Sequence, residues 1–212
     1  MAISKRKQKF WDVEIPLIQK TTYLYAFELE SLDGKTLIYD LTRILRGKGA
    51  LLTAKVKVND KNVTTIPKEI KVLPYFLRRM VRKGTDYVED SLVLECKDAR
   101  LIIKPLLVTR RKVSRRIKNA LREKSKKELA EYIKENYVEE IFKEILQGKL
   151  QKILSIALKK VYTLSVYEIK TIRVESQKEI SKPENKKTKK KKQKPVQEEK
   201  NSETRENTEI KE

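Results

Sequence analysis

The sequence contains no histidine, one cysteine and only five glycines among its 212 residues. Without histidine there is no imidazole for acid–base catalysis, for a histidine-based triad or for metal binding. The single cysteine, Cys96, can form neither an internal disulfide nor a cysteine-cluster metal site. It lies in LVLECKD, a strand-like segment in which an inert, small residue is favoured over a reactive thiol. We therefore expect no cofactor.

Glycine is too sparse for a loop that cradles phosphate. The segment LRGKGALL contains Gly47 and Gly49, but it lacks the Gly-Lys-Ser/Thr ending and the strand–loop–helix context of such a loop. The carboxylate pair Glu139–Glu140 belongs to the polar side of an expected helix, and Glu198–Glu199 belongs to the C-terminal segment. The sequence thus shows no catalytic constellation, and we expect a protein that is not an enzyme.

Long apolar runs are also missing. The longest, LIIKPLLV, is short and is interrupted by Lys104 and Pro105, so no transmembrane helix is predicted. The basic N-terminal residues MAISKRKQKF are not followed by an apolar stretch, which argues against a signal peptide. These features predict a soluble, cytoplasmic protein.

Positive charge, in contrast, is abundant. The chain has 51 Lys and Arg against 30 Asp and Glu, a formal net charge of +21. Residues 176–212 contribute only +4, because they contain 12 basic and 8 acidic residues, and residues 1–175 therefore carry +17. Because charge of one sign repels itself in a compact fold, a polyanion that neutralises it is the expected partner.

Alternating apolar and polar residues predict several strands. FWDVEIP forms a first strand that ends at Pro16. Residues 21–45 are expected to form a hairpin with Asp33-Gly34 as its tight turn, and residues 87–109 a second hairpin. ALLTAKVKVND predicts a half-buried strand with a basic outer side.

Helical spacing appears twice. LPYFLRRMVRKGT predicts a short helix with Pro74 in its first turn and Gly84 just past its end. Residues 117–161 predict two or three helices, with interruptions at Asn136 and Gly148. VYTLSVYEIKTIRVE then returns to strand composition and is expected to pair with the earlier sheet. The predicted fold class is α+β: a mostly antiparallel sheet, a C-terminal group of two or three helices and a returning strand.

Three parts are expected along the chain. Residues 1–9 form a basic arm, residues 10–175 an α+β domain that carries most of the charge expected to bind a polyanion, and residues 176–212 a lysine-rich tail. The tail contains the low-complexity run KKTKKKKQK and few aliphatic residues, so it cannot bury enough apolar surface to become ordered.

The segment VTRRKVSRRIK is the strongest candidate for a binding site. Six of the ten residues in 109–118 are basic: Arg110, Arg111, Lys112, Arg115, Arg116 and Lys118. Positive charge at a helix N-terminus opposes the helix dipole, and basic side chains three or four positions apart repel one another if the segment is helical. Phosphate would relieve both effects, and Arg matches its geometry well. We therefore favour phosphate contact over a merely solvated helix start.

Other basic and aromatic groups are weaker candidates. Phosphate contact is also predicted for Arg78, Arg79, Arg82 and Lys83 at the end of the short helix, and for Lys5, Arg6 and Lys7 in the N-terminal arm. Lys55 and Lys57 are equally consistent with ordinary solvated strand residues. Three aromatic residues share one strand face and are interpreted as core rather than as a base-stacking platform: Tyr23, Tyr25 and Phe27.

The order of these segments resembles the archaeal and eukaryotic small-subunit ribosomal protein family 1e, also called 3Ae. The matching segments are, in order, FWDVEIP, DGKTLIYDLTRIL, LRRMVRKGTDYVEDSLVLECKD, TRRKVSRRIK and VYTLSVYEIKTIR. They cover roughly residues 6–175, and their order and spacing, rather than any single motif, carry the resemblance. Phe10 stands where the family usually has Trp, and Thr163 where it usually has Pro.

The resemblance implies a barrel-like sheet and a place in the platform of the small ribosomal subunit, near the mRNA exit and the 3′ end of the small-subunit rRNA. The implied partners are small-subunit rRNA and neighbouring ribosomal proteins, with mRNA near the exit as a further candidate. Neither a membrane nor a second copy of the chain is expected. Recognition of RNA would rely on shape and phosphates. The lack of His and the abundance of Lys and Glu would suit a thermophilic archaeon.

Alternatives to a ribosomal protein stay open at this point. An RNA-processing enzyme such as a nuclease would have to work with Asp, Glu and Lys alone. A non-ribosomal RNA-binding protein would also fit the charge. A binder of anionic membranes or other polyanions would use the tail, residues 176–212.

Overall fold

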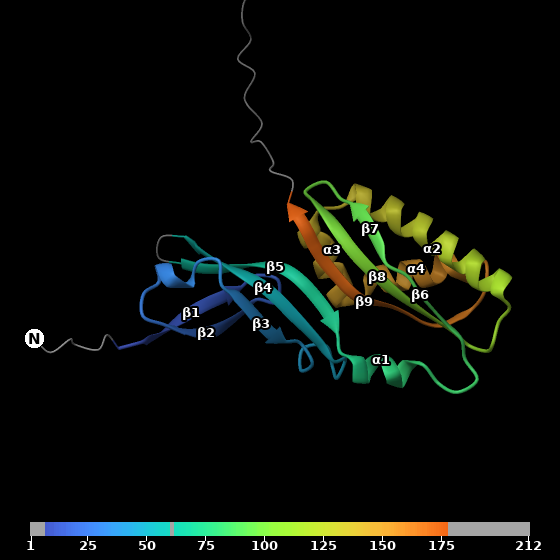
Figure 1. Cartoon of the computed structure of the whole chain (residues 1–212), viewed down its shortest axis with the longest axis horizontal. Coiled ribbons are helices and arrows are strands. Elements are labelled where there is room, and N and C mark those ends of the chain that lie inside the picture. The colour runs from blue at the N-terminus through green and yellow to red at the C-terminus, as the bar shows by residue number, and fades with distance from the viewer. Residues whose placement is uncertain (1–6, 60–61, 178–212) are drawn as a thin grey trace, which may run out of the picture. The chain divides into compact units, whose positions relative to one another are not determined.

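The structure is a computed structural model that describes residues 7–59 and 62–177 (Figure 1). Its strands are β1 (Lys9–Ile15), β2 (Lys20–Ala26), β3 (Thr36–Asp40), β4 (Ala50–Asn59), β5 (Asn62–Val72), β6 (Tyr87–Glu89), β7 (Leu92–Glu95), β8 (Ala99–Thr109) and β9 (Leu164–Gln177). Its helices are the 3₁₀ turn η1 (Glu30–Leu32), α1 (Pro74–Met80), α2 (Arg115–Glu135), α3 (Val138–Gln147) and α4 (Lys149–Lys159). The tail beyond residue 177 lies outside the described residues.

The nine described strands form one open sheet. Its main path runs β2-β1-β5-β9-β8-β6, while β4 and β3 extend from β5, and β7 pairs with β8. All pairs are antiparallel except the single parallel contact of β1 and β5 at Glu14 and Thr64. The predicted α+β class, the mostly antiparallel sheet and the returning strand β9 are thereby confirmed. The described strands curve around a core but leave the path open, since it ends at β2 and at β6.

The hairpin predicted for residues 21–45 is wrong. β2 pairs with β1, with Phe10 opposite Tyr25, whereas β3 pairs with β4. Between β2 and β3 the chain forms η1, whose Leu32 is buried in the core at 1% exposure. The dipeptide expected in the hairpin turn instead contacts β4, because the Gly34 N–H donates to the carbonyl of Val56 at 3.0 Å. The second predicted hairpin is confirmed as β7 and β8.

Strand β5 has no counterpart among the predicted elements. Its sequence, NVTTIPKEIKV, contains Pro67, which is uncommon inside a strand. The proline is accommodated at an irregularity, because Ala54 of β4 pairs with Pro67 while the preceding Thr53 pairs with Glu69. β5 is central to the fold, since it pairs with β1, β4 and β9.

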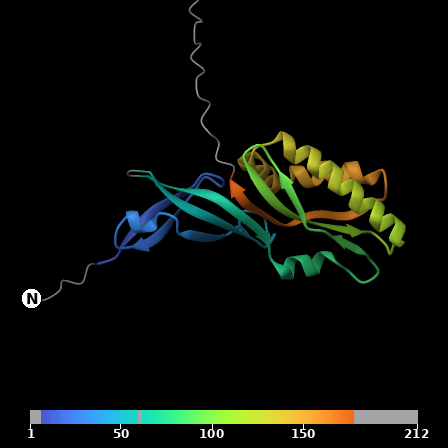
Figure 2. The same cartoon turned by 45° about the horizontal axis from the view of Figure 1, so that its top comes forward.

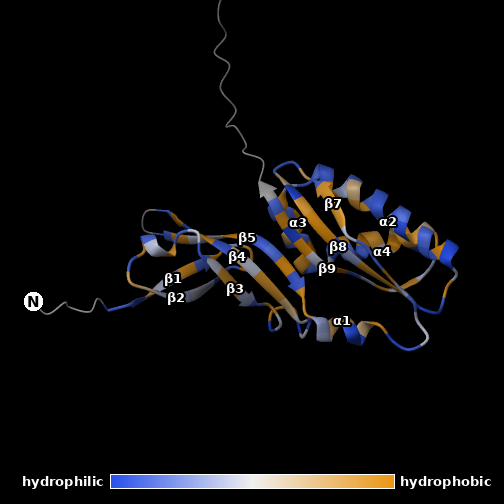
Figure 3. Ribbon diagram, viewed as in Figure 1, coloured by the Kyte–Doolittle hydropathy of each residue, from blue (hydrophilic) through white to orange (hydrophobic). Residues whose placement is uncertain are grey.

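Helices α2, α3 and α4 cover one face of the sheet around β7, β8 and β9 (Figures 1 and 2). The predicted interruptions between them are confirmed. The Asn136 side chain donates to the carbonyl of Tyr132 at 2.9 Å and ends α2. Gly148, with φ of 71°, separates α3 from α4 in the left-handed conformation that glycine adopts easily. β8 is largely hydrophobic, whereas much of α2 is hydrophilic (Figure 3). Leu101, Ile103 and Leu107 of β8 belong to the same buried cluster as residues of α2–α4.

Helix α1 packs on the opposite face of the sheet. Successive strand residues point to opposite faces; Leu107 of β8 belongs to the core under α2–α4, and its neighbours Leu106 and Val108 form a second cluster with Leu77 of α1. The predicted short helix is confirmed, with Pro74 at its first position, but the end expected just before Gly84 is wrong, because α1 ends at Met80. No described helix is long and apolar enough to span a membrane.

Candidate nucleic-acid interface

The basic segment 110–118 is divided between a connection and a helix. Arg110, Arg111 and Lys112 lie between β8 and α2, and α2 begins only at Arg115. The expected helical repulsion between Arg111 or Lys112 and the residues of α2 is therefore wrong, because positions 111 and 112 are not helical. The helix-dipole argument holds for Arg115, since the first turn of α2 contains no acidic residue.

Asp86 holds this connection in place. Its Oδ2 accepts a hydrogen bond from the N–H of Val113 at 2.9 Å and lies 3.0 Å from the ammonium group of Lys118. The Val113 hydrogen bond, followed by that of Lys118, lowers the pKa of the Asp86 carboxyl below its usual value. Lys118 is thus engaged in an ion pair, unlike the other five basic residues of the segment.

Asp86 also joins the two predicted basic groups. The N–H of Thr109, at the end of β8, donates to the carbonyl of Asp86 at 2.8 Å, and the N–H of Asp86 donates to the Thr109 hydroxyl at 3.1 Å. One residue earlier, the Thr85 hydroxyl donates to the carbonyl of Arg82 at 2.7 Å. The segment that follows α1 is therefore hydrogen-bonded to the segment that precedes α2.

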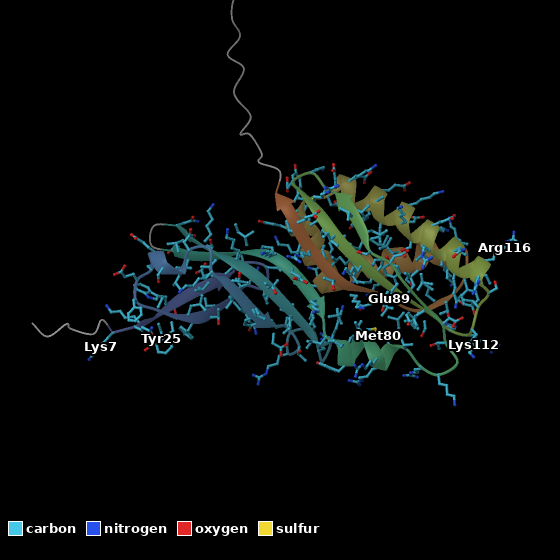
Figure 4. All side chains as sticks on the ribbon, in the orientation of Figure 1. Lys7, Tyr25, Met80, Glu89, Lys112 and Arg116 are labelled. Carbon is cyan, nitrogen blue, oxygen red and sulfur yellow. The ribbon has the colours of Figure 1, made fainter. Side chains whose placement is uncertain are left out.

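These contacts join the segment after α1 to the segment before α2. We call the nine predicted site residues of α1, of these two segments and of the first turn of α2 the basic surface: Arg78, Arg79, Arg82, Lys83, Arg110, Arg111, Lys112, Arg115 and Arg116. All nine side chains are exposed, and no carboxylate of the described residues forms an ion pair with any of them. Figure 4 shows Lys112 in the connection before α2 and Arg116 in the first turn of α2. Seven of the nine are Arg, the side chain whose planar group pairs best with phosphate.

Two cavities flank β6 within the basic surface. One, of about 580 Å³, lies between β6 and the first turns of α2 and is lined by Arg115, Lys118, Asn119 and Arg122. The other, of about 360 Å³, lies between α1 and the sheet. Its polar lining comes from Arg78, Lys71, Lys170 and Glu89.

The sequence interpretation missed three basic residues in this part of the fold: Lys71, Lys104 and Arg122. Lys71 of β5 and Lys104 of β8 flank Thr171 on one rung of the sheet and are exposed on the face opposite α2–α4. Arg122 pairs with Asp90 at 2.9 Å at the edge of the larger cavity. In the sequence, only the alternation of apolar and polar residues within β5 points to an exposed Lys71. Its position near Lys104 could not be predicted, because it depends on the pairing of β5 and β8 with β9.

The other predicted candidates do not join the basic surface. Lys5 and Arg6 lie outside the described residues, and Lys7 lies near Tyr25 beside β1 and β2 (Figure 4). The interpretation of Tyr23, Tyr25 and Phe27 as core is wrong, since they are 68%, 55% and 50% exposed. The inner face of β2 carries Leu24 and Ala26 instead, so the aromatic side chains point outward.

Three ionisable side chains outside the basic surface are buried or half-buried in the packing of the fold: Tyr132, Tyr167 and Cys96. Burial raises the pKa of Tyr167, whose hydroxyl lies 3.2 Å from that of Ser125. Burial and the neighbouring Glu144 carboxylate raise the pKa of Tyr132 to about 12. Cys96 is buried at 4% exposure, as expected for an inert thiol. Over residues 7–59 and 62–177, no group of three or more Cys, Asp and Glu is arranged to hold a metal ion.

A comparison with known protein families finds one match. The model of the Ribosomal S3Ae family matches residues 27–178, which is well over half of the chain and includes the whole basic surface. A search of curated proteins found no match.

Proposed function

The chain belongs to the Ribosomal S3Ae family and is therefore a structural protein of the small ribosomal subunit, and we propose that it binds small-subunit rRNA through the basic surface. The observation that carries this proposal is that the segments holding the two predicted basic groups are hydrogen-bonded to each other through Asp86, and that their nine Arg and Lys side chains are exposed and form no ion pair with a carboxylate of the described residues. A protein that needed its positive charge only for solubility would not have to concentrate it on one hydrogen-bonded unit.

The physical basis is neutralisation of phosphates. Each phosphate paired with Lys or Arg releases condensed counterions, which makes binding strong at low salt and weak at high salt. Arg115 and Arg116 stand at a helix N-terminus, where their charge opposes the dipole, while a phosphate bound to them would be stabilised by that same dipole. The free chain thus has an electrostatic cost that RNA removes.

The finer assignments follow from the family resemblance. We place the chain at the platform of the small subunit, near the mRNA exit, with neighbouring ribosomal proteins as further partners and mRNA as a candidate ligand. The role is structural and requires neither a catalytic group nor a cofactor. The predicted tail, beyond residue 177, and the N-terminal Lys5 and Arg6 would add charge to the same RNA contacts.

Sedimentation of a native lysate tests the ribosomal assignment. We expect the protein to migrate with small subunits at low and moderate salt and to be released from them as the salt concentration rises, because binding through phosphates weakens with salt. Migration with free proteins at every salt concentration would contradict the proposal. Truncation at residue 177 separates it from the polyanion-binding alternative, since the basic surface predicts that rRNA binding persists without the tail.

A further inference from the structure

Tyr87 is an exposed aromatic residue in the middle of the basic surface. It opens β6, the last strand of the sheet path, and its side chain is 54% exposed. Its cross-strand neighbour is Val108, which packs in the cluster under α1, so the Tyr87 ring lies on the α1 face of the sheet. Tyr87 contributes to the lining of both cavities that flank β6.

Positive charge surrounds Tyr87 on both sides. Arg115 lines the cavity toward α2, where Arg122 is paired with Asp90, and Arg78 and Lys71 line the cavity toward α1. The acidic neighbours of Tyr87 are already neutralised. Asp86 pairs with Lys118 at 3.0 Å, and Glu89 pairs with Lys170 at 3.2 Å.

We propose that Tyr87 is a stacking site for an unpaired RNA base, and that the phosphates on either side of this base lie in the two cavities. This inference rests on the proposed rRNA binding and adds a class of ligand to it: a single-stranded or bulged nucleotide rather than a duplex. An exposed tyrosine offers one π-face that accepts any base, and flanking Arg and Lys hold the backbone.

A group of exposed aromatic residues on the β1–β2 hairpin does not have this arrangement. On the outer face of the β1–β2 hairpin, Tyr23 lies opposite Asp12, and Glu14 lies on the same face. These carboxylates form no described ion pair and would repel phosphates. Tyr25 in this group is 55% exposed, almost the same as Tyr87, and therefore serves as a matched control.

The test uses the full chain and two probes, a short oligoadenylate carrying 2-aminopurine and an RNA duplex of the same length. Stacking on a tyrosine quenches the fluorescence of 2-aminopurine. We expect Tyr87→Ala to weaken oligoadenylate binding about ten-fold and to remove the quenching, because loss of one stacked base typically has an effect of this size. Tyr87→Phe should keep both, and Tyr25→Ala should change neither.

The outcomes separate this inference from the proposed function. Duplex binding and the salt dependence of both probes should be unchanged in Tyr87→Ala, because the phosphate contacts remain. Retained quenching and affinity in Tyr87→Ala, an equal loss in Tyr25→Ala, or loss in Tyr87→Phe would overturn the stacking site. Thermal unfolding of Tyr87→Leu, which keeps apolar packing but has no ring, controls for damage to β6. A Tyr87→Leu variant that folds normally and still quenches would likewise overturn it.

Discussion

The carboxylate of Asp86 lies 3.0 Å from the ammonium group of Lys118 and accepts a hydrogen bond from the N–H of Val113 at 2.9 Å. A single acidic residue thus fixes the start of α2 relative to β6. Because the backbone of Asp86 is also bonded to Thr109, it sets the position of the basic groups on both sides.

Replacement of Asp86 therefore tests whether this residue supports RNA binding by positioning the nearby basic residues or opposes it through its negative charge. Asp86→Ala raises the net charge of the chain, and a purely electrostatic view predicts tighter RNA binding. We expect weaker binding to small-subunit rRNA, because the connection that carries residues 110–112 loses its acceptor. Asp12→Ala changes the charge equally at a site remote from these hydrogen bonds and should not weaken binding. Filter binding at one salt concentration measures both, and tighter binding by Asp86→Ala would refute the positioning role.

Asp86 should also make stability depend on pH. Its hydrogen bonds lower the pKa of the carboxyl in the folded state, so its contribution is present above the unfolded pKa, near 4, and is lost as the pH falls through the lower, folded value. The difference in melting temperature between the native chain and Asp86→Asn should be constant from neutral pH to about pH 5 and shrink below about pH 4. A difference that grew on acidification would contradict this sign.

Helix α4 offers a paired test of the core. Leu154 is 1% exposed and Ile156 is 71% exposed on the same helix. Leu154→Ala should lower the free energy of unfolding by about 2–5 kcal/mol, because it removes apolar atoms and leaves a cavity. Ile156→Ala should change it by less than about 0.5 kcal/mol. Urea unfolding monitored by circular dichroism measures both, and equal effects would show that α4 does not pack as described.

The junction of α3 and α4 depends on Gly148, whose backbone has a left-handed conformation. A Cβ at Gly148 would meet no atom within 4 Å, so the effect of a side chain there is confined to the backbone conformation. Gly148→Ala should destabilise the fold by about 1 kcal/mol, and Gly148→Asn by less, since asparagine tolerates this region better. Thermal unfolding checks the order of the two variants, and an Ala variant as stable as the native chain would contradict it.

Local patterns were sufficient to predict much of the fold. The short helix α1, the interruptions at Asn136 and Gly148 and the hairpin of β7 and β8 all depend on neighbouring residues, and all were predicted correctly. The failures concern which strands pair. β2 forms a hairpin with the preceding strand β1 across residues 16–19, whereas β3 pairs with β4, and β5, which pairs with three strands, was not predicted at all.

The candidate site was predictable in composition but not in geometry. Runs of Arg and Lys identified both halves of the basic surface. The connection between the two halves depends on hydrogen bonds between Asp86 and Thr109. These residues are 23 positions apart and come together only when β6 pairs with β8. The role proposed for Tyr87 likewise depends on cavities that exist only in the folded chain.

The salt dependence of rRNA binding tests the central claim most directly. The variant replaces Arg110, Arg111, Arg115 and Arg116 with Gln, and the control replaces four exposed lysines of α3 and α4 with Gln: Lys143, Lys149, Lys152 and Lys159. Both lose the same charge. The basic surface predicts that the logarithmic salt slope falls by about three in the arginine variant, at roughly 0.7–0.9 per lost phosphate contact, and changes little in the control. Equal slopes for the two variants would contradict binding through the basic surface.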